Sequence, residues 1–126
     1  MKFSVDKNER YVVLRLQEQN LNSLMAPTLK SEFIFFANEG VQNLILDVQD
    51  VQYVDSSGLS AILTANRLFK GEGSFVLTGV AHPNLKKLIE ISRVDTVLTI
   101  IPTVSEAIEY ILMEELERDL QDAEED

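Results

Sequence analysis

The chain has 126 residues, 45% of them hydrophobic, which is enough for one hydrophobic core but not for two. It contains no cysteine and a single histidine, which excludes disulfides, thiolate catalysis, cysteine-ligated metals and multi-histidine metal centres. No apolar run reaches the roughly 20 residues that span a bilayer, and the chain does not open with a basic segment followed by an apolar one. We therefore expect a cytoplasmic protein with no cofactor, no metal and no direct membrane insertion.

The net charge of −10 is concentrated at the C-terminal end. Residues 114–126 contain eight carboxylates and one arginine, whereas residues 1–113 contain 13 acidic and 10 basic residues. Without a basic stripe to neutralise phosphates, nucleic acid is not an expected partner. We predict one domain over residues 1–113 and an acidic tail over residues 114–126, which is either a helix end or disordered.

The first part of the chain predicts an antiparallel hairpin. Phe3 and Val5 alternate with polar residues, residues 6–10 supply a polar turn, and residues 11–16 are apolar and β-branched. Residues 17–23 are expected to form a loop.

A helix and a buried strand are expected next. Pro27 suits the first turn of a helix that ends at Gly40. Residues 44–48 form a short apolar run between turn signals, which predicts a strand covered on both faces. The helix is expected to turn four residues inward: Leu29, Phe33, Phe36 and Ala37.

The rest of the chain alternates between helices and strands. Five further elements are predicted, namely a helix over residues 57–70, a strand over 74–78, a helix from Pro83, a strand over 97–101, and a helix opened by the capping-box pair Thr103 and Glu106. Strands separated by about ten or more helical residues pair in parallel with right-handed crossovers. We therefore predict an α/β fold with a mixed, mostly parallel sheet, an opening antiparallel hairpin and helices packed on the sheet.

The helix over residues 57–70 is expected to place one apolar face on the sheet. The residues of this face recur at helical spacing: Gly58, Ala61, Ile62, Ala65, Leu68 and Phe69. Leu59 and Leu63 lie on the opposite side of the helix, near Ser56 and Ser60. They either pack against another helix or present apolar surface to a partner, and internal packing is the preferred interpretation.

Two serines stand where a β-rich run gives way to this helix. Unpaired backbone N–H groups converge at such a junction, so a phosphate on Ser56 or Ser57 would meet positive potential. The alternative is ordinary capping, in which one serine satisfies a free N–H group. The two roles can coexist, with Ser56 capping the helix and Ser57 modified.

The string Asp55-Ser56-Ser57-Gly58-Leu59, in this order of elements, resembles the signature of the STAS domain, the family of bacterial anti-sigma factor antagonists. The resemblance covers about residues 1–115. It implies that the unmodified protein binds an anti-sigma factor that is itself a serine kinase, and that phosphorylation ends this binding. The second serine of the pair, Ser57, corresponds to the family's phosphorylated residue, and a separate serine phosphatase restores the binding form.

The resemblance also implies roles for the neighbouring residues. Asp55 and Ser56 would shape the loop, Gly58 would allow close approach of the backbone, and Leu59 would anchor the helix or its partner. Family members commonly carry a glycine and then an aspartate in the loop before the first helix, whereas residues 19–22 read Gln-Asn-Leu-Asn here. Asn22 and Ser23 are expected to form a secondary contact region, with helix capping as an equal alternative.

Enzymatic functions have little support in the sequence. Ser57 lacks the flanking glycines of a nucleophile elbow, His82 is interpreted as a turn residue before Pro83, and the glycines do not form a phosphate-binding loop. Two hypotheses remain: a phosphorylation-regulated antagonist, and a constitutive scaffold subunit of a larger signalling or transport complex. Homodimer formation stays open.

Overall fold

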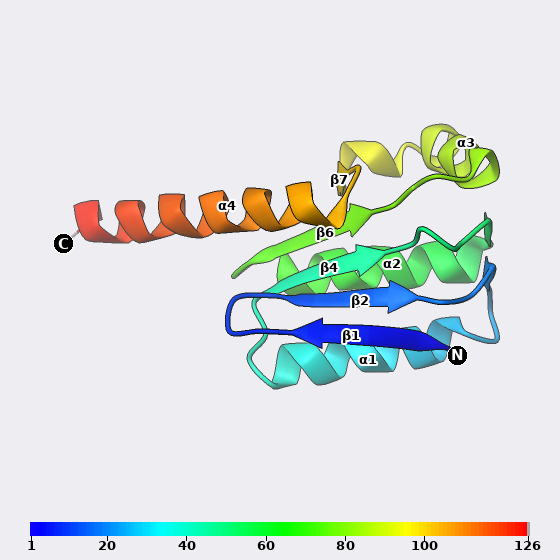
Figure 1. The fold of residues 1–126 in the computed structure, drawn as a ribbon, viewed down its shortest axis with the longest axis horizontal. Coiled ribbons are helices and arrows are strands. Elements are labelled where there is room, and N and C mark those ends of the chain that lie inside the picture. The colour runs from blue at the N-terminus through cyan, green and yellow to red at the C-terminus, as the bar shows by residue number, and fades with distance from the viewer. Residues whose placement is uncertain (126) are drawn as a thin grey trace.

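A computed structural model of the protein describes residues 1–125 and contains a five-stranded sheet in the order β1-β2-β4-β6-β7 (Figure 1). β1 runs antiparallel to β2, and the other neighbouring strands are parallel, which confirms the predicted mixed α/β fold. The strands are β1 (Phe3–Lys7), β2 (Val12–Leu16), β4 (Asn43–Asp47), β6 (Ser74–Thr78) and β7 (Thr99–Ile101). The helices are α1 (Ala26–Asn38), α2 (Ser56–Phe69), α3 (Pro83–Ser92) and α4 (Val104–Glu125), with a 3₁₀ turn η1 (Val94–Thr96).

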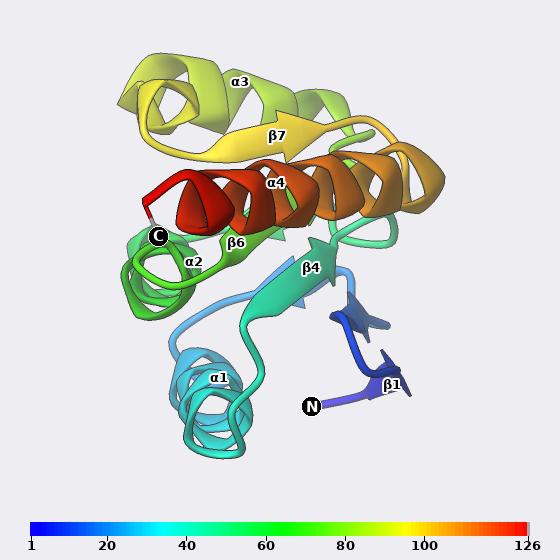
Figure 2. The same cartoon turned by 90° about the vertical axis from the view of Figure 1, so that its left-hand side faces the viewer.

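The central strands are buried on both faces because their side chains alternate between two apolar clusters. α1 and α2 lie side by side on one face of the sheet, over the larger cluster (Figure 2). On the opposite face, α4 packs Ala107 and Ile111 on Val13, Ile45 and Val76. The strand predicted over residues 44–48 is thus confirmed as covered on both faces. Among residues 1–125, no helix is long and apolar enough to cross a membrane.

A second, two-stranded sheet lies outside the main one. Its strands, β3 (Asn20–Leu21) and β5 (Tyr53–Val54), pair in parallel. The carbonyl of Gln19 accepts hydrogen bonds from the N–H groups of Gln52 and Tyr53. The loop predicted over residues 17–23 therefore contains a strand, because a partner more than thirty residues away, rather than local sequence, orders this segment.

Two further predictions are corrected by the structure. Leu68 is 40% exposed, and Asn66 is buried in its place. At 100° per residue both lie at the edges of the buried stripe, so the orientation of α2 on the sheet decides which edge is covered. The strand predicted over residues 97–101 begins only at Thr99, because the preceding residues form η1 and Leu98 N–H donates to the carbonyl of Val94.

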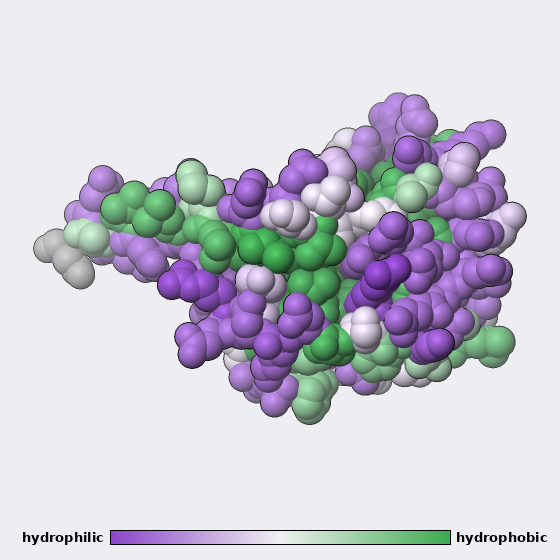
Figure 3. Space-filling model, in the orientation of Figure 1, coloured by the Kyte–Doolittle hydropathy of each residue, from purple (hydrophilic) through white to green (hydrophobic). Residues whose placement is uncertain are grey.

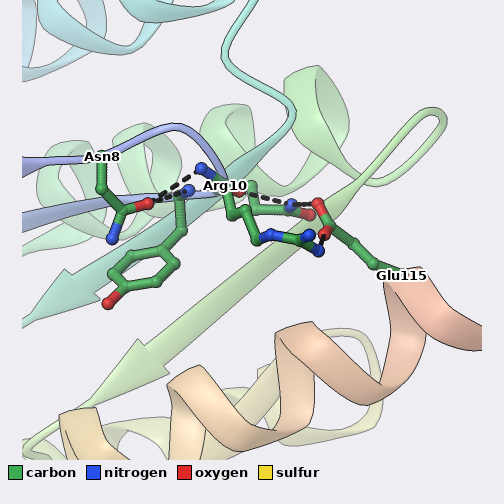
Figure 4. A network of polar contacts seen from close by, with 5 residues as sticks. Asn8, Arg10 and Glu115 are labelled. Carbon is green, nitrogen blue, oxygen red and sulfur yellow. Dashed lines mark hydrogen bonds and ion pairs between the residues drawn. The ribbon is translucent and has the colours of Figure 1, made fainter.

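A partly buried polar network joins α4 to the sheet (Figure 4). The Glu115 carboxylate accepts hydrogen bonds from Asn43 Nδ2 at 2.7 Å and from the guanidinium of Arg10 at 3.0 Å. Asn43 is fully buried, also donates to the Arg10 carbonyl, and accepts from the N–H of Ser74. α4 continues through Glu115 without a break, so the helix itself marks no boundary at residue 113. The division into a domain and a tail at that residue stays a prediction.

The Asn43 network yields a test of stability. Replacement of Asn43 by alanine removes the hydrogen bonds to Glu115 and to the Arg10 carbonyl and leaves buried polar groups without partners. We expect Asn43→Ala to lower the free energy of unfolding by roughly 1–3 kcal/mol in urea denaturation. The control is Asn38→Ala at the exposed end of α1, which should change the free energy of unfolding by less than about 0.5 kcal/mol. Equal effects of the two substitutions would contradict the importance of the network.

Candidate functional site

The serine pair lies at the start of α2, at the end of the molecule where the parallel strands finish (Figure 1). Asp55 is the N-cap residue, and its Oδ1 accepts a hydrogen bond from Gly58 N–H at 2.9 Å. The expectation that a serine caps this helix is therefore wrong. The carboxylate already satisfies the N–H group that a capping hydroxyl would reach, and Ser56 and Ser57 occupy the first two positions of the helix itself.

Asp55 also connects the two predicted contact regions. Its Oδ2 accepts a hydrogen bond from Ser23 N–H at 3.1 Å, and its own N–H donates to the Leu21 carbonyl at 3.2 Å. The structure thus brings Asn22 and Ser23 beside residues 55–59. Asn22 Oδ1 accepts from Leu24 N–H, so Asn22 caps the turn before α1 and not the helix, whose own N-cap makes no side-chain hydrogen bond.

Gly58 permits the close approach of α2 to β3. A Cβ atom at this position would overlap the Leu21 carbonyl oxygen and would lie 2.9 Å from a side-chain carbon of Leu21 and of Val54. The contact is with backbone and packed side chains, which cannot move aside freely. Gly58 is therefore suited to this position because it has no side chain to separate α2 from β3.

The serines themselves are accessible and lack partners. Ser56 is exposed and Ser57 is half-buried. Within residues 1–125, neither their hydroxyls nor their backbone N–H groups make hydrogen bonds. The first turn of α2 holds no acidic residue, and the Lys30 ammonium lies 3.5 Å from the Ser60 hydroxyl, one turn further along. A negative group added here would meet free N–H donors and the positive end of the helix dipole.

Leu59 and Leu63 are half-buried and pack against the large core cluster, which supports the preferred interpretation of internal packing. Two exposed apolar residues that the sequence did not single out lie on the segments next to the site. Leu24, which follows the Asp55-bound Ser23, is 85% exposed, and Tyr53 of β5 is 54% exposed. Both residues lie between the elements predicted from the sequence, and single apolar residues at such positions are too common to be diagnostic.

His82 has a structural role here. It is the N-cap of α3, and its Nδ1 accepts a hydrogen bond from Asn84 N–H at 3.2 Å, in agreement with its interpretation as a turn residue. Its ring stands 5.8 Å from that of Tyr53. In the described part of the chain, no three His, Cys, Asp or Glu side chains are placed to share a metal ion.

Comparisons with known proteins agree on one family. The family model described as the STAS domain matches residues 2–107. BtrV of Bordetella bronchiseptica, which is named as an anti-sigma factor antagonist, is 30% identical over 93 residues, covering 73% of this chain and 78% of its own length.

Solved structures show the same fold. A Thermotoga maritima protein described as an anti-sigma factor antagonist superposes with a TM-score of 0.76 at 25% identity, covering 86% of this chain and 93% of its own. SpoIIAA of Bacillus in its phosphorylated form gives a TM-score of 0.66 at 21% identity, covering 87% of this chain and 99% of its own. The unphosphorylated form of SpoIIAA gives a TM-score of 0.67 at 21% identity, covering 87% of this chain and 97% of its own.

The steric constraint at Gly58 is testable with one methyl group. Gly58→Ala places a Cβ against the Leu21 carbonyl, and we expect a loss of roughly 1–3 kcal/mol of stability despite the better helix propensity of alanine. Gly71→Ala is the matched control, because Gly71 has open space around it and no positive φ, so the substitution should be neutral or slightly stabilising. Urea denaturation measures both. If Gly58→Ala leaves the free energy of unfolding unchanged, α2 is able to move away from β3.

The packing of Leu63 gives a second test. We expect Leu63→Glu to lower the free energy of unfolding by roughly 1–3 kcal/mol, because it places a charge among apolar side chains. Leu24→Glu, at an exposed position, should change it by less than about 0.5 kcal/mol. If Leu63→Glu leaves the melting temperature unchanged and still abolishes binding of a partner, Leu63 belongs to a partner surface instead.

Proposed function

The chain belongs to the STAS domain family, and on this premise we propose that it is an anti-sigma factor antagonist switched by phosphorylation of Ser57. In its unphosphorylated form it binds an anti-sigma factor that is also a serine kinase. The kinase transfers a phosphate to the Ser57 hydroxyl and the complex separates. A serine phosphatase then restores the binding form. In this role the protein acts as a binding partner and substrate and not as an enzyme.

The observation that carries the proposal is the unpartnered, accessible serine pair held in place by Asp55. Because the carboxylate caps the helix, the hydroxyls are not needed for folding and are free to react. The proposal also draws on the relatives named as anti-sigma factor antagonists and on the existence of phosphorylated and unphosphorylated structures of the similarly folded SpoIIAA.

The proposed binding surface surrounds this helix start. Leu24 and Tyr53 supply exposed apolar area on two segments that Asp55 and the β3–β5 pairing hold together. Asn22, Ser23 and Ser56 supply polar contacts at the same end. Leu59, packed on the core, would anchor α2 beneath the surface.

The charge of a phosphate is expected to act on the complex more than on the fold. A phosphoserine adds about −1.5 to −2 charges, and the exposed start of a helix offsets charge by about 0.3–1 kcal/mol. A partner docked over Ser57 would have to desolvate the dianion close to the Asp55 carboxylate. Unless the partner supplies a basic group, this desolvation costs several kcal/mol. A loss of only about 1.4 kcal/mol already weakens binding tenfold.

The decisive experiment measures binding of Ser57 variants to the anti-sigma factor kinase of the same organism by isothermal titration calorimetry. We expect Ser57→Asp to weaken binding by more than about tenfold while the melting temperature changes little. Ser57→Asn, equal in size but neutral, should bind more tightly than Ser57→Asp. Mass spectrometry after incubation with the kinase and ATP should locate phosphate on Ser57, and Ser56→Ala should still be modified.

Two outcomes would reject this function. One is an unmodified Ser57 after incubation with the kinase. The other is a Ser57→Asp variant that binds as tightly as the unmodified chain, which would favour the constitutive scaffold subunit.

A further inference from the structure

α4 carries a second apolar stripe that the rest of residues 1–125 leaves exposed to a large extent. Leu112, Met113, Leu116 and Leu120 are 39%, 58%, 52% and 57% exposed. At 100° per residue they occupy a sector of about 100°, turned by about 100° or more from Ala107 and Ile111, the fully buried residues of α4 that pack on the sheet. The fold needs only one apolar stripe on this helix, so the second has no role in the core.

The stripe continues into a groove at the edge of the domain. Ile108, Leu112 and Leu116 form one wall of a hollow of about 730 Å³, and the turn between β1 and β2, including Arg10 and Tyr11, forms the other. Figure 3 shows hydrophobic surface extending from the body of the molecule along α4 toward its C-terminal end. From residue 108 to residue 120 this face is about 18 Å long, which suits a helix of a partner.

The charges beside the stripe indicate the chemistry of that partner. Glu117 and Glu124 lie on one side of the stripe, and Asp119 and Asp122 on the other, at 100° per residue. The one arginine of this segment, Arg118, faces the sheet, where it donates a hydrogen bond to Ser74 at 3.0 Å. A second copy of the chain would bring two strongly acidic segments together, and an anionic membrane surface would be repelled in the same way.

We propose that the outer half of α4 and its groove dock an amphipathic helix of another protein, with lysine or arginine on both sides of an apolar ridge. The apolar ridge covers the stripe, and the basic residues pair with the flanking carboxylates. This surface lies at the opposite end of the molecule from Ser57, because α2 starts where the parallel strands end whereas α4 runs back past their beginnings (Figure 1). The chain can therefore hold this partner and the partner at Ser57 at the same time.

The test uses the full chain and a synthetic amphipathic peptide of leucine and lysine, about 18 residues long. We expect binding in fluorescence anisotropy that weakens as salt is added. The double variant Leu116→Gln/Leu120→Gln should lose at least about tenfold in affinity. Ile91→Gln, at an exposed position of α3, should bind as the unmodified chain does. The charge reversal Glu117→Lys/Glu124→Lys should also weaken binding, without touching the apolar residues.

Three results would overturn the proposal. A scrambled peptide of the same composition that binds equally well would mean that only charge is recognised. Full affinity of the Leu116→Gln/Leu120→Gln variant, with its helix content unchanged by circular dichroism, would mean that the stripe is not used. A dimer of the free chain in sedimentation, converted to a monomer by the same variant, would identify a second copy as the occupant.

Discussion

The arrangement of the candidate site depends on one carboxylate, that of Asp55. Its two oxygens accept hydrogen bonds from backbone N–H groups on different segments, one at the start of α2 and one before α1. Gly58 allows these segments to come together, because no Cβ separates α2 from the Leu21 carbonyl. With the helix start fixed in this way, Ser57 is presented at a constant position without using its own hydroxyl.

Glu115 has a comparable role on the other face of the sheet. Its carboxylate is bound by the fully buried Asn43 and by Arg10, and it stands near the middle of the 22-residue helix α4. The half of α4 before Glu115 packs on the sheet through Ala107 and Ile111. Arg118 is the last described residue of α4 that hydrogen-bonds to the sheet, and the exposed leucines before and after it, Leu116 and Leu120, lie on a side of the helix turned away from the sheet. A helix that extends past its packing partner gains little from the core, so its exposed leucines call for another explanation.

The sequence predicted the order of the main elements because their signals are local. The apolar run at 44–48 and the helical spacing of Leu29, Phe33 and Phe36 each report which faces are covered. The alternation of Phe3 and Val5 predicted the strand but not its burial, since Val5 is 42% exposed. The β3–β5 pair was missed because two-residue strands leave no pattern and are set by pairing across the fold. Asp55 was not recognised as the cap, since aspartate and serine are both good N-caps and stand side by side here. The link between Glu115 and Asn43 joins residues 72 positions apart, which no local pattern could reveal.

The two surfaces are separated enough to act independently. α4 is about 33 Å long at 1.5 Å per residue, and its acidic end points away from the start of α2. Charges in solution are screened over about 8–10 Å at physiological ionic strength, so a phosphate on Ser57 would scarcely alter the potential at the end of α4. The hydrogen-bond networks of Asp55 and Glu115 share no residue, and a close-packed sheet lies between them. Substitutions at the two ends should therefore have additive effects, and a departure from additivity would mean that the sheet itself changes conformation.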